Sequence, residues 1–184
     1  MAAEIFETRQ WTPFPVELVF AFFANPSNLL HISPPVLKTR VESLQIVPPA
    51  ARPQAADPVR RFKSVAAGAG SELTISFRPI AWLPFRVRWT ARIVEFDWFS
   101  HFVDEQVKGP FAFFRHRHGI EAQKRSGAEG TLVSDQIEFI LPGWWLGALL
   151  QRRVRRQLEV QFAVRQQRLE QVLEAAARQA RAQR

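Results

Sequence analysis

The hydrophobic pattern of this chain changes its period once, and that change restricts the fold more than any other feature. Apolar and polar residues alternate from 85 to 93, a two-residue period typical of a β-strand with one buried face. The apolar residues of this stretch are Phe85, Val87, Trp89, Ala91 and Ile93. After Gly143, apolar residues recur every four or seven positions as far as Leu173, which predicts one amphipathic helix. We therefore expect a strand-rich part followed by a long C-terminal helix.

The other segments fit the same plan. Short apolar or alternating runs bounded by turn residues predict further strands at about 4–10, 41–47, 71–77, 98–107, 111–123 and 131–141. Two short helices should follow the first strand, one in VELVFAFFANP and one at 27–31, because prolines end both segments. The last helix should run from about Trp144 to near Ala176. These elements predict an α+β fold, in which a curved antiparallel sheet of six to seven strands is covered by the long helix and a cavity lies between them.

Length and composition exclude several classes of protein. At 184 residues the chain fits one domain, which we assign to 1–176, with a frayed basic tail at 177–184. The absence of cysteine excludes disulfides, thiolate metal sites and a cysteine nucleophile, and it is compatible with a cytoplasmic protein. We see no signal peptide and no apolar run of the roughly 18 residues that a transmembrane helix needs. Four prolines make 48–63 an expected extended loop.

The positive charge is concentrated in the C-terminal segment. The whole chain carries +8, and from 143 to 184 nine arginines stand against three glutamates, a net charge of +6. Such a helix is either a solvated surface or a site that attracts nucleic acid or an anionic membrane. No nucleic-acid motif accompanies the charge, so we expect no nucleic-acid partner. Weak contact with an anionic membrane, helped by Trp144 and Trp145, stays open, as does a role of these tryptophans in the core.

The most informative site signal is the segment FVDEQVKGPFAFFRHRHGI, residues 102–120. It predicts two strands joined by a tight connection, and the second strand carries His116 and His118. Alternate strand residues share a face, so both imidazoles should lie together, beside Phe114. Ala112 and Ile120 should share this helix-facing side of the sheet, as should Val133 and Phe139 of the next strand.

Asp135 is expected on the same face, on the strand paired with the two histidines. A buried carboxylate without a partner is costly, so a histidine or an arginine should accompany it. Three interpretations remain open for this group. It could be a structural polar network, it could recognise oxygen atoms of a ligand in an apolar cavity, or it could carry out chemistry. In the last case His116 or His118 would act as acid or base, or both would bind a metal with Asp135, although this pattern is a weak metal signal.

The connection before the histidine strand contains four further motif residues whose role the sequence does not define: Asp104, Gln106, Gly109 and Pro110. If the turn is tight and regular, Asp104 and Gln106 point away from the histidines and Asp104 pairs with Arg115. A bulge would place them on the histidine face instead.

Three strings along the chain resemble the SRPBCC superfamily, the helix-grip fold of START-like and polyketide cyclase/dehydrase-like proteins. They are PVELVFAFFANPSNLLHISPP, FVDEQVKGPFAFFRHRH and GTLVSDQIEFILPGWW. The chain looks most like the bacterial ligand-binding subgroup, and the resemblance covers nearly its whole length. It departs from that pattern in the insertion at 48–63 and in Phe114, where a tryptophan is expected.

The resemblance implies a binding protein for a hydrophobic small molecule such as a lipid, a quinone or a polyketide, without a cofactor. We expect Trp89, Phe114 and Phe139 to form apolar walls, and His116, His118 and Asp135 to supply the polar contacts. The alternatives are a cyclase or dehydratase that uses one of the histidines, and a peripheral lipid-transfer module on a membrane surface. The sequence does not define the oligomeric state.

Overall fold

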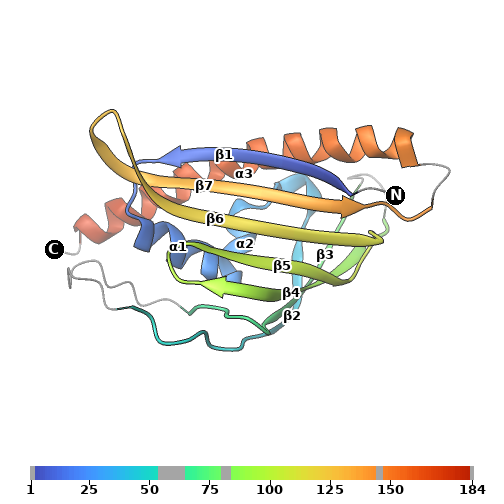
Figure 1. Cartoon of the computed structure of the whole chain (residues 1–184), viewed down its shortest axis with the longest axis horizontal. Helices are drawn as coiled ribbons and strands as arrows, with labels where there is room; N and C mark the ends of the chain where they lie inside the picture. The colour runs from blue at the N-terminus through green and yellow to red at the C-terminus, as the bar shows by residue number, and fades with distance from the viewer. Residues whose placement is uncertain (1–2, 54–64, 80–83, 144–146, 183–184) are drawn as a thin grey trace.

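A seven-stranded antiparallel sheet and one long helix that lies along it make up most of the fold (Figure 1). The computed structural model describes residues 3–53, 65–79, 84–143 and 147–182. The strands are β1 (Glu4–Thr12), β2 (Arg40–Gln45), β3 (Glu72–Phe77), β4 (Val87–Asp97), β5 (His101–Lys108), β6 (Phe113–Arg125) and β7 (Ala128–Ile140). The helices are α1 (Val16–Ala24), η1 (Pro26–Asn28), α2 (Leu29–Ile32), η2 (Pro35–Leu37) and α3 (Gly147–Ala182).

The sheet has the strand order β1-β7-β6-β5-β4-β3-β2. Strands β2 to β7 therefore form a meander, and β1 pairs with β7 at one edge of the sheet. The predicted α+β fold with its curved antiparallel sheet is confirmed. In the described part of the chain, no helix is both long enough and apolar enough to cross a membrane.

The two short helical segments after β1 lie against the same face of the sheet as α3 (Figure 1). Helix α1 ends where Pro26 follows Asn25, because proline cannot continue the helical hydrogen bonds. The Asn25 side chain accepts a hydrogen bond from the Ser27 backbone N–H at 3.1 Å and starts the turn η1. The predicted helix at 27–31 is thus a 3₁₀ turn followed by one turn of α-helix.

Apolar side chains fill the space between the sheet and the helices in two clusters. One centres on Phe20 of α1, which is fully buried, with Phe102 of β5 and Leu169 of α3. The other joins Phe6 of β1 to Phe162 of α3, whose rings lie 5.3 Å apart. Helix α3 contributes to both clusters and so fixes the sheet and α1 relative to each other.

Several expectations about boundaries need correction. Phe85 precedes β4 and is 48% exposed. Ala112 lies in the β5–β6 connection and is exposed. Helix α3 continues to Ala182 rather than ending near Ala176. The expected loop is described only at 48–53, where no helix or strand forms. The rest of the loop and the Trp144-Trp145 pair lie outside the described residues.

The register of β5 and β6 decides which side chains meet. Asp104 lies opposite His116, and Glu105 lies opposite Arg115. Residues directly opposite each other in paired strands point to the same face of the sheet. The Asp104 side chain therefore lies on the same face as those of His116 and His118. The alternative in which Asp104 pairs with Arg115 is wrong. Arg115 instead donates to Glu105 and to Glu95, each at 2.6 Å, on the other face of the sheet.

Candidate ligand-binding site

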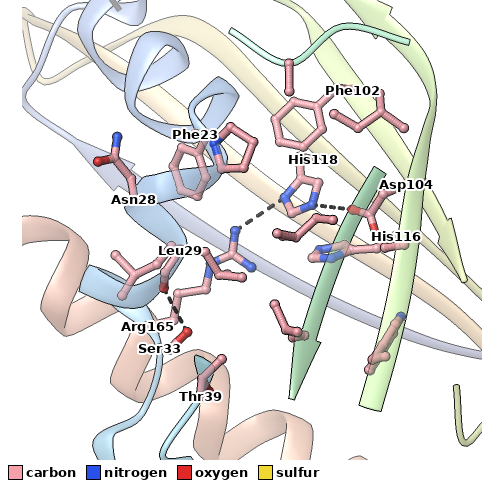
Figure 2. A pocket seen from close by; sticks show the side chains of 18 of the residues that line it. Phe23, Asn28, Leu29, Ser33, Thr39, Phe102, Asp104, His116, His118 and Arg165 are labelled. Atoms are coloured by element: carbon pink, nitrogen blue, oxygen red, sulfur yellow. Dashed lines mark hydrogen bonds and ion pairs between the residues drawn. The ribbon is translucent and has the colours of Figure 1, made fainter. Parts of the chain in front are cut away.

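A cavity of about 290 Å³ lies between the sheet, the α1–α2 segment and α3. Most of its wall is apolar (Figure 2). From the sheet it is lined by residues that include Ile75, Trp89, Ile93, Phe102, Phe114 and Ile137, and from the helices by Phe22, Phe23, Leu29, Ile32, Leu158 and Phe162. An apolar wall with a few polar groups is the usual composition of a small-molecule site.

Five polar side chains form one connected group at this cavity, which we call the polar cluster: Asp104, His116, His118, Asp135 and Arg165. Four of them line the cavity, whereas Asp135 does not. Asp135 is 5% exposed and lies behind the imidazoles on β7.

Asp135 is the common acceptor of the polar cluster. Its Oδ1 lies 2.9 Å from His116 Nε2, 3.1 Å from His118 Nδ1 and 3.5 Å from Arg165 Nη2. Because Arg165 and the two imidazoles surround it, its pKa is held well below the usual range although burial acts to raise it. Asp135 is therefore a buried anion that three cationic or donor groups stabilise.

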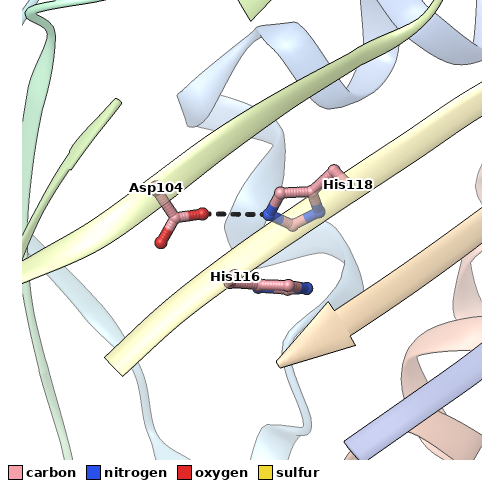
Figure 3. A group of neighbouring side chains, drawn as sticks. All are labelled: Asp104, His116 and His118. Atoms are coloured by element: carbon pink, nitrogen blue, oxygen red, sulfur yellow. Dashed lines mark hydrogen bonds and ion pairs between the residues drawn. The ribbon is translucent and has the colours of Figure 1, made fainter. Parts of the chain in front are cut away.

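His118 lies between two carboxylates. Its Nε2 lies 3.0 Å from Asp104 Oδ2 (Figure 3). Its Nδ1 lies 3.1 Å from Asp135 Oδ1. Burial acts to lower the pKa of His118, but the two carboxylates outweigh burial and raise it. The pKa of Asp104 is lowered, because the hydrogen bond to His118 and the nearby positive charge outweigh its burial. His118 therefore favours the protonated form, in which both ring nitrogens donate.

Aromatic contacts hold the charged groups in place. The His118 ring stacks on Phe102 with a centroid separation of 4.3 Å and an angle of 21°, and the His116 ring lies 3.7 Å from that of His118. The Arg165 guanidinium lies 5.1 Å from the ring centroids of both Phe23 and Phe162. Such cation–π contacts stabilise a guanidinium away from bulk water.

His116 differs from His118 in its protonation. Burial lowers the pKa of His116 to about 4, and the charge on His118 acts in the same direction. His116 is thus neutral near pH 7. Since a carboxylate can only accept, the Nε2 atom that faces Asp135 at 2.9 Å must carry the proton. The Nδ1 atom of His116 is left with its lone pair.

One nitrogen or oxygen each from Asp104, His116 and His118 lie within 4.8 Å of one another, a spacing that a metal ion could use. The surroundings favour ion pairing instead. Arg165 Nη2 lies 3.3 Å from His118 Nδ1, and a metal cation there would be repelled by the guanidinium. Two carboxylates are already balanced by Arg165 and His118. We therefore treat the group as a protein ion-pair network.

The structure brings most of the sequence-predicted site residues together. Trp89, Phe114, His116 and His118 line the cavity. Asp135 supports them from behind, as a partner of both histidines and of an arginine. Phe139 is a correction, because it is only 2% exposed in the core and does not line the cavity.

The remaining motif residues divide by role. Asp104 belongs to the polar cluster. Gln106 instead holds the β5–β6 connection, donating to Phe111 O at 2.8 Å and accepting from Phe111 N–H at 3.3 Å. Gly109 passes directly over the Gln106 side chain, where a Cβ would collide with it. Pro110 lies in the same connection and does not line the cavity.

Arg165 is the functional residue that the sequence interpretation missed. The apolar stripe of α3 runs through Leu158, Phe162 and Leu169, and position 165 falls in the seven-residue gap of that stripe. A charged residue at an inward-facing helical position is a signal that it has a buried partner. The cavity wall formed by α1 and α2 was also missed, because only the packing of the short helices against the sheet reveals it.

No family model matches this chain, and no curated protein matches it. Solved structures do match over nearly the whole length. They include TTHA0849 from Thermus thermophilus, with 20% identity, a TM-score of 0.57 and coverage of 94% of this chain and 99% of that one. Protein CV1439 from Chromobacterium violaceum shows 13% identity, a TM-score of 0.60 and coverage of 92% and 96%.

A third similar structure is Ara h 8.0201, a Bet v 1-like protein, with 13% identity, a TM-score of 0.55 and coverage of 91% of this chain and 97% of that one. At these identities the similarity establishes the fold. The fold matches the helix-grip description, an antiparallel sheet with a long C-terminal helix lying along it.

Proposed function

We propose that this protein binds a hydrophobic small molecule in the cavity between the sheet and α3. The observation that carries the proposal is the cavity itself, a largely apolar space of about 290 Å³ with four side chains of the polar cluster on its wall. Burial of apolar ligand surface would supply the affinity, and the polar cluster would orient the ligand.

The fold supports this proposal, since helix-grip proteins of the Bet v 1 type commonly bind hydrophobic ligands. A lipid, a quinone or a polyketide-like molecule would suit the apolar wall. Within the superfamily, the sequence strings favour the bacterial ligand-binding subgroup. A cytoplasmic protein that acts without a cofactor or a nucleic-acid partner is part of the same proposal.

A cavity-filling variant tests the proposal. Ala91 lines the cavity on β4, so Ala91→Phe would place a phenyl ring inside it. The probe is N-phenyl-1-naphthylamine, an uncharged fluorophore whose emission rises in apolar surroundings. We expect saturable enhancement with the unaltered protein and a loss of affinity of at least tenfold in Ala91→Phe.

The matched control is Val94→Phe, which places the same phenyl ring at an exposed position of the same strand. It should bind the probe like the unaltered protein, and circular dichroism should show that both variants are folded. No saturable binding, or equal binding by Ala91→Phe, would contradict the proposal.

A cyclase or dehydratase is the second candidate, and the His116–Asp135 pair is the observation that favours it. A neutral imidazole that is oriented by a carboxylate and keeps one free lone pair is the arrangement of a general base. Turnover of a polyketide-like substrate would then fall as pH decreases towards about 4, the pKa of His116. A rate that does not change in His116→Gln would remove this candidate.

A further inference from the structure

The cavity wall carries a hydrogen-bond acceptor that no described residue engages. His116 Nδ1 forms no hydrogen bond with any described residue, although His116 Nε2 is fixed on Asp135. It is not among the fully enclosed unpartnered atoms of the described part. Since His116 lines the cavity, the lone pair of Nδ1 is open to the cavity and can accept a hydrogen bond there.

Arg165 supplies complementary donors. Its Nη2 donates towards Asp135 Oδ1 at 3.5 Å and lies 3.3 Å from His118 Nδ1, which carries a proton and cannot accept from it. Its remaining N–H groups have no hydrogen-bond partner in the same part of the chain and are likewise not enclosed. Arg165 and His116 both pack on Phe162, the guanidinium 5.1 Å and the imidazole 5.7 Å from its centroid. An acceptor and a donor therefore lie at the same part of the cavity.

The charges of the polar cluster are already balanced. Asp104 and Asp135 carry two negative charges, and Arg165 and His118 carry two positive ones. An anionic ligand group would face the lone pair of His116 Nδ1 and would leave a net charge in an apolar space, which is costly. A hydroxyl group meets neither difficulty, because it can donate to His116 and accept from Arg165.

We infer that the ligand is an uncharged, largely apolar molecule with a hydroxyl group that donates to His116 Nδ1, while Arg165 donates to an oxygen at the same end of the ligand. This inference rests on the proposed function, since it names the ligand class of the same cavity. Aliphatic alcohols, phenols and enols share this chemistry. The polar end would lie beside Phe162, and the apolar body would extend towards Trp89 and Ile93, which also line the cavity.

Isothermal titration calorimetry at pH 7 with a matched pair of probes tests the inference. 1-Naphthol and 1-methoxynaphthalene have the same ring system, but only the naphthol can donate a hydrogen bond. We expect 1-naphthol to bind about tenfold more tightly, which is the effect of one buried hydrogen bond. Equal affinities would overturn the inference and leave the proposed function standing. Binding of neither probe would count against both.

Two further arms make the test specific. His116→Phe should reduce the preference for 1-naphthol to near one, whereas His101→Phe should preserve it, because His101 does not line the cavity. If His116→Phe does not fold, the two affinities of the unaltered protein still decide the question. Tighter binding of 1-naphthoate than of 1-naphthol would overturn the claim that the ligand is uncharged.

Discussion

Asp135 is the residue on which the polar cluster depends, because its carboxylate contacts both histidines and the arginine. Removing one partner of a buried ion pair leaves the other charges uncompensated. We expect Asp135→Asn to lower the free energy of unfolding by about 3 kcal/mol, measured by urea denaturation. It should also lower the pKa of His118, which NMR titration of the imidazole would show.

The control for this prediction is Glu138→Gln, on the same strand. It removes the same charge from a residue that is only half-buried and that does not line the cavity. Its free energy of unfolding should stay within about 0.5 kcal/mol of the unaltered protein. A similar loss in both variants would show that the effect of Asp135→Asn does not come from the cluster.

The two histidines make stability depend on pH in opposite directions. The folded protein keeps His116 neutral down to about pH 4, whereas the unfolded chain protonates it near pH 6.5. Unfolding in this interval takes up a proton, so the free energy of unfolding should fall between pH 6.5 and 4, on the order of 3 kcal/mol. His118 has a raised pKa, so its contribution is complete below pH 6.5 and is lost as pH rises through that raised value.

Denaturant unfolding at a series of pH values measures this dependence. His116→Gln should remove most of the slope between pH 6.5 and 4, whereas His101→Gln should keep it. An unchanged slope in His116→Gln would mean that His116 is not held neutral by the fold.

At the scale of elements, the β5–β6 connection sets which residues reach the cavity. Gln106 fixes the connection through both backbone groups of Phe111. The Phe111 ring in turn packs on Trp89, Phe114 and Phe139, with centroid separations of 5.6, 5.1 and 5.7 Å. The local hydrogen bonds of the loop therefore support one end of the cavity wall.

Gly109→Ala tests this connection. The added Cβ would collide with the Gln106 side chain, which would have to leave Phe111, so we expect a loss of about 1–2 kcal/mol in the free energy of unfolding. Gln106→Ala should cost a similar amount. The double variant should cost clearly less than the sum, because both changes break the same contacts. Additive effects in this cycle would show that the two residues act independently.

The sequence predicted elements wherever a period was long and regular. The alternation through Trp89 and Ile93 identified β4, and the spacing of His116 and His118 correctly predicted that they share a face. The sequence could not predict whether Asp104 lies on the same face of the sheet as the two histidines, because this depends on the number of residues in the connection between the strands. The sequence did not predict Arg165 as a site residue, because its partner Asp135 is 30 positions away in the sequence. Only the packing of α3 on the sheet brings the two side chains together.

At the scale of the whole molecule, the first turns of α3 present an arginine-rich surface. Arg152, Arg153 and Arg156 are exposed, and Arg155, which is also exposed, donates to Ile5 O at 3.1 Å. Exposed charges of this kind attract anionic surfaces weakly, and salt screens them. We expect co-sedimentation with vesicles that contain phosphatidylserine at about 20 mM salt, and little at about 150 mM.

Replacement of these three arginines by glutamate should abolish the vesicle contact, whereas Arg178→Glu, nearer the other end of the helix, should not. Equal recovery with neutral vesicles would show that charge does not drive the contact. Neither result bears on the proposal that the cavity binds a ligand, because none of the three arginines lines the cavity.

The central claim is that the space between the sheet and α3 holds a hydrophobic small molecule, and native mass spectrometry of the purified protein tests it most directly. The protein would be incubated with a total lipid extract, desalted and compared with Ala91→Phe treated in the same way. We predict a discrete adduct on the unaltered protein, recovered by solvent extraction, and its loss from Ala91→Phe. The mass of the bare chain alone, or the same adduct on both proteins, would contradict the claim.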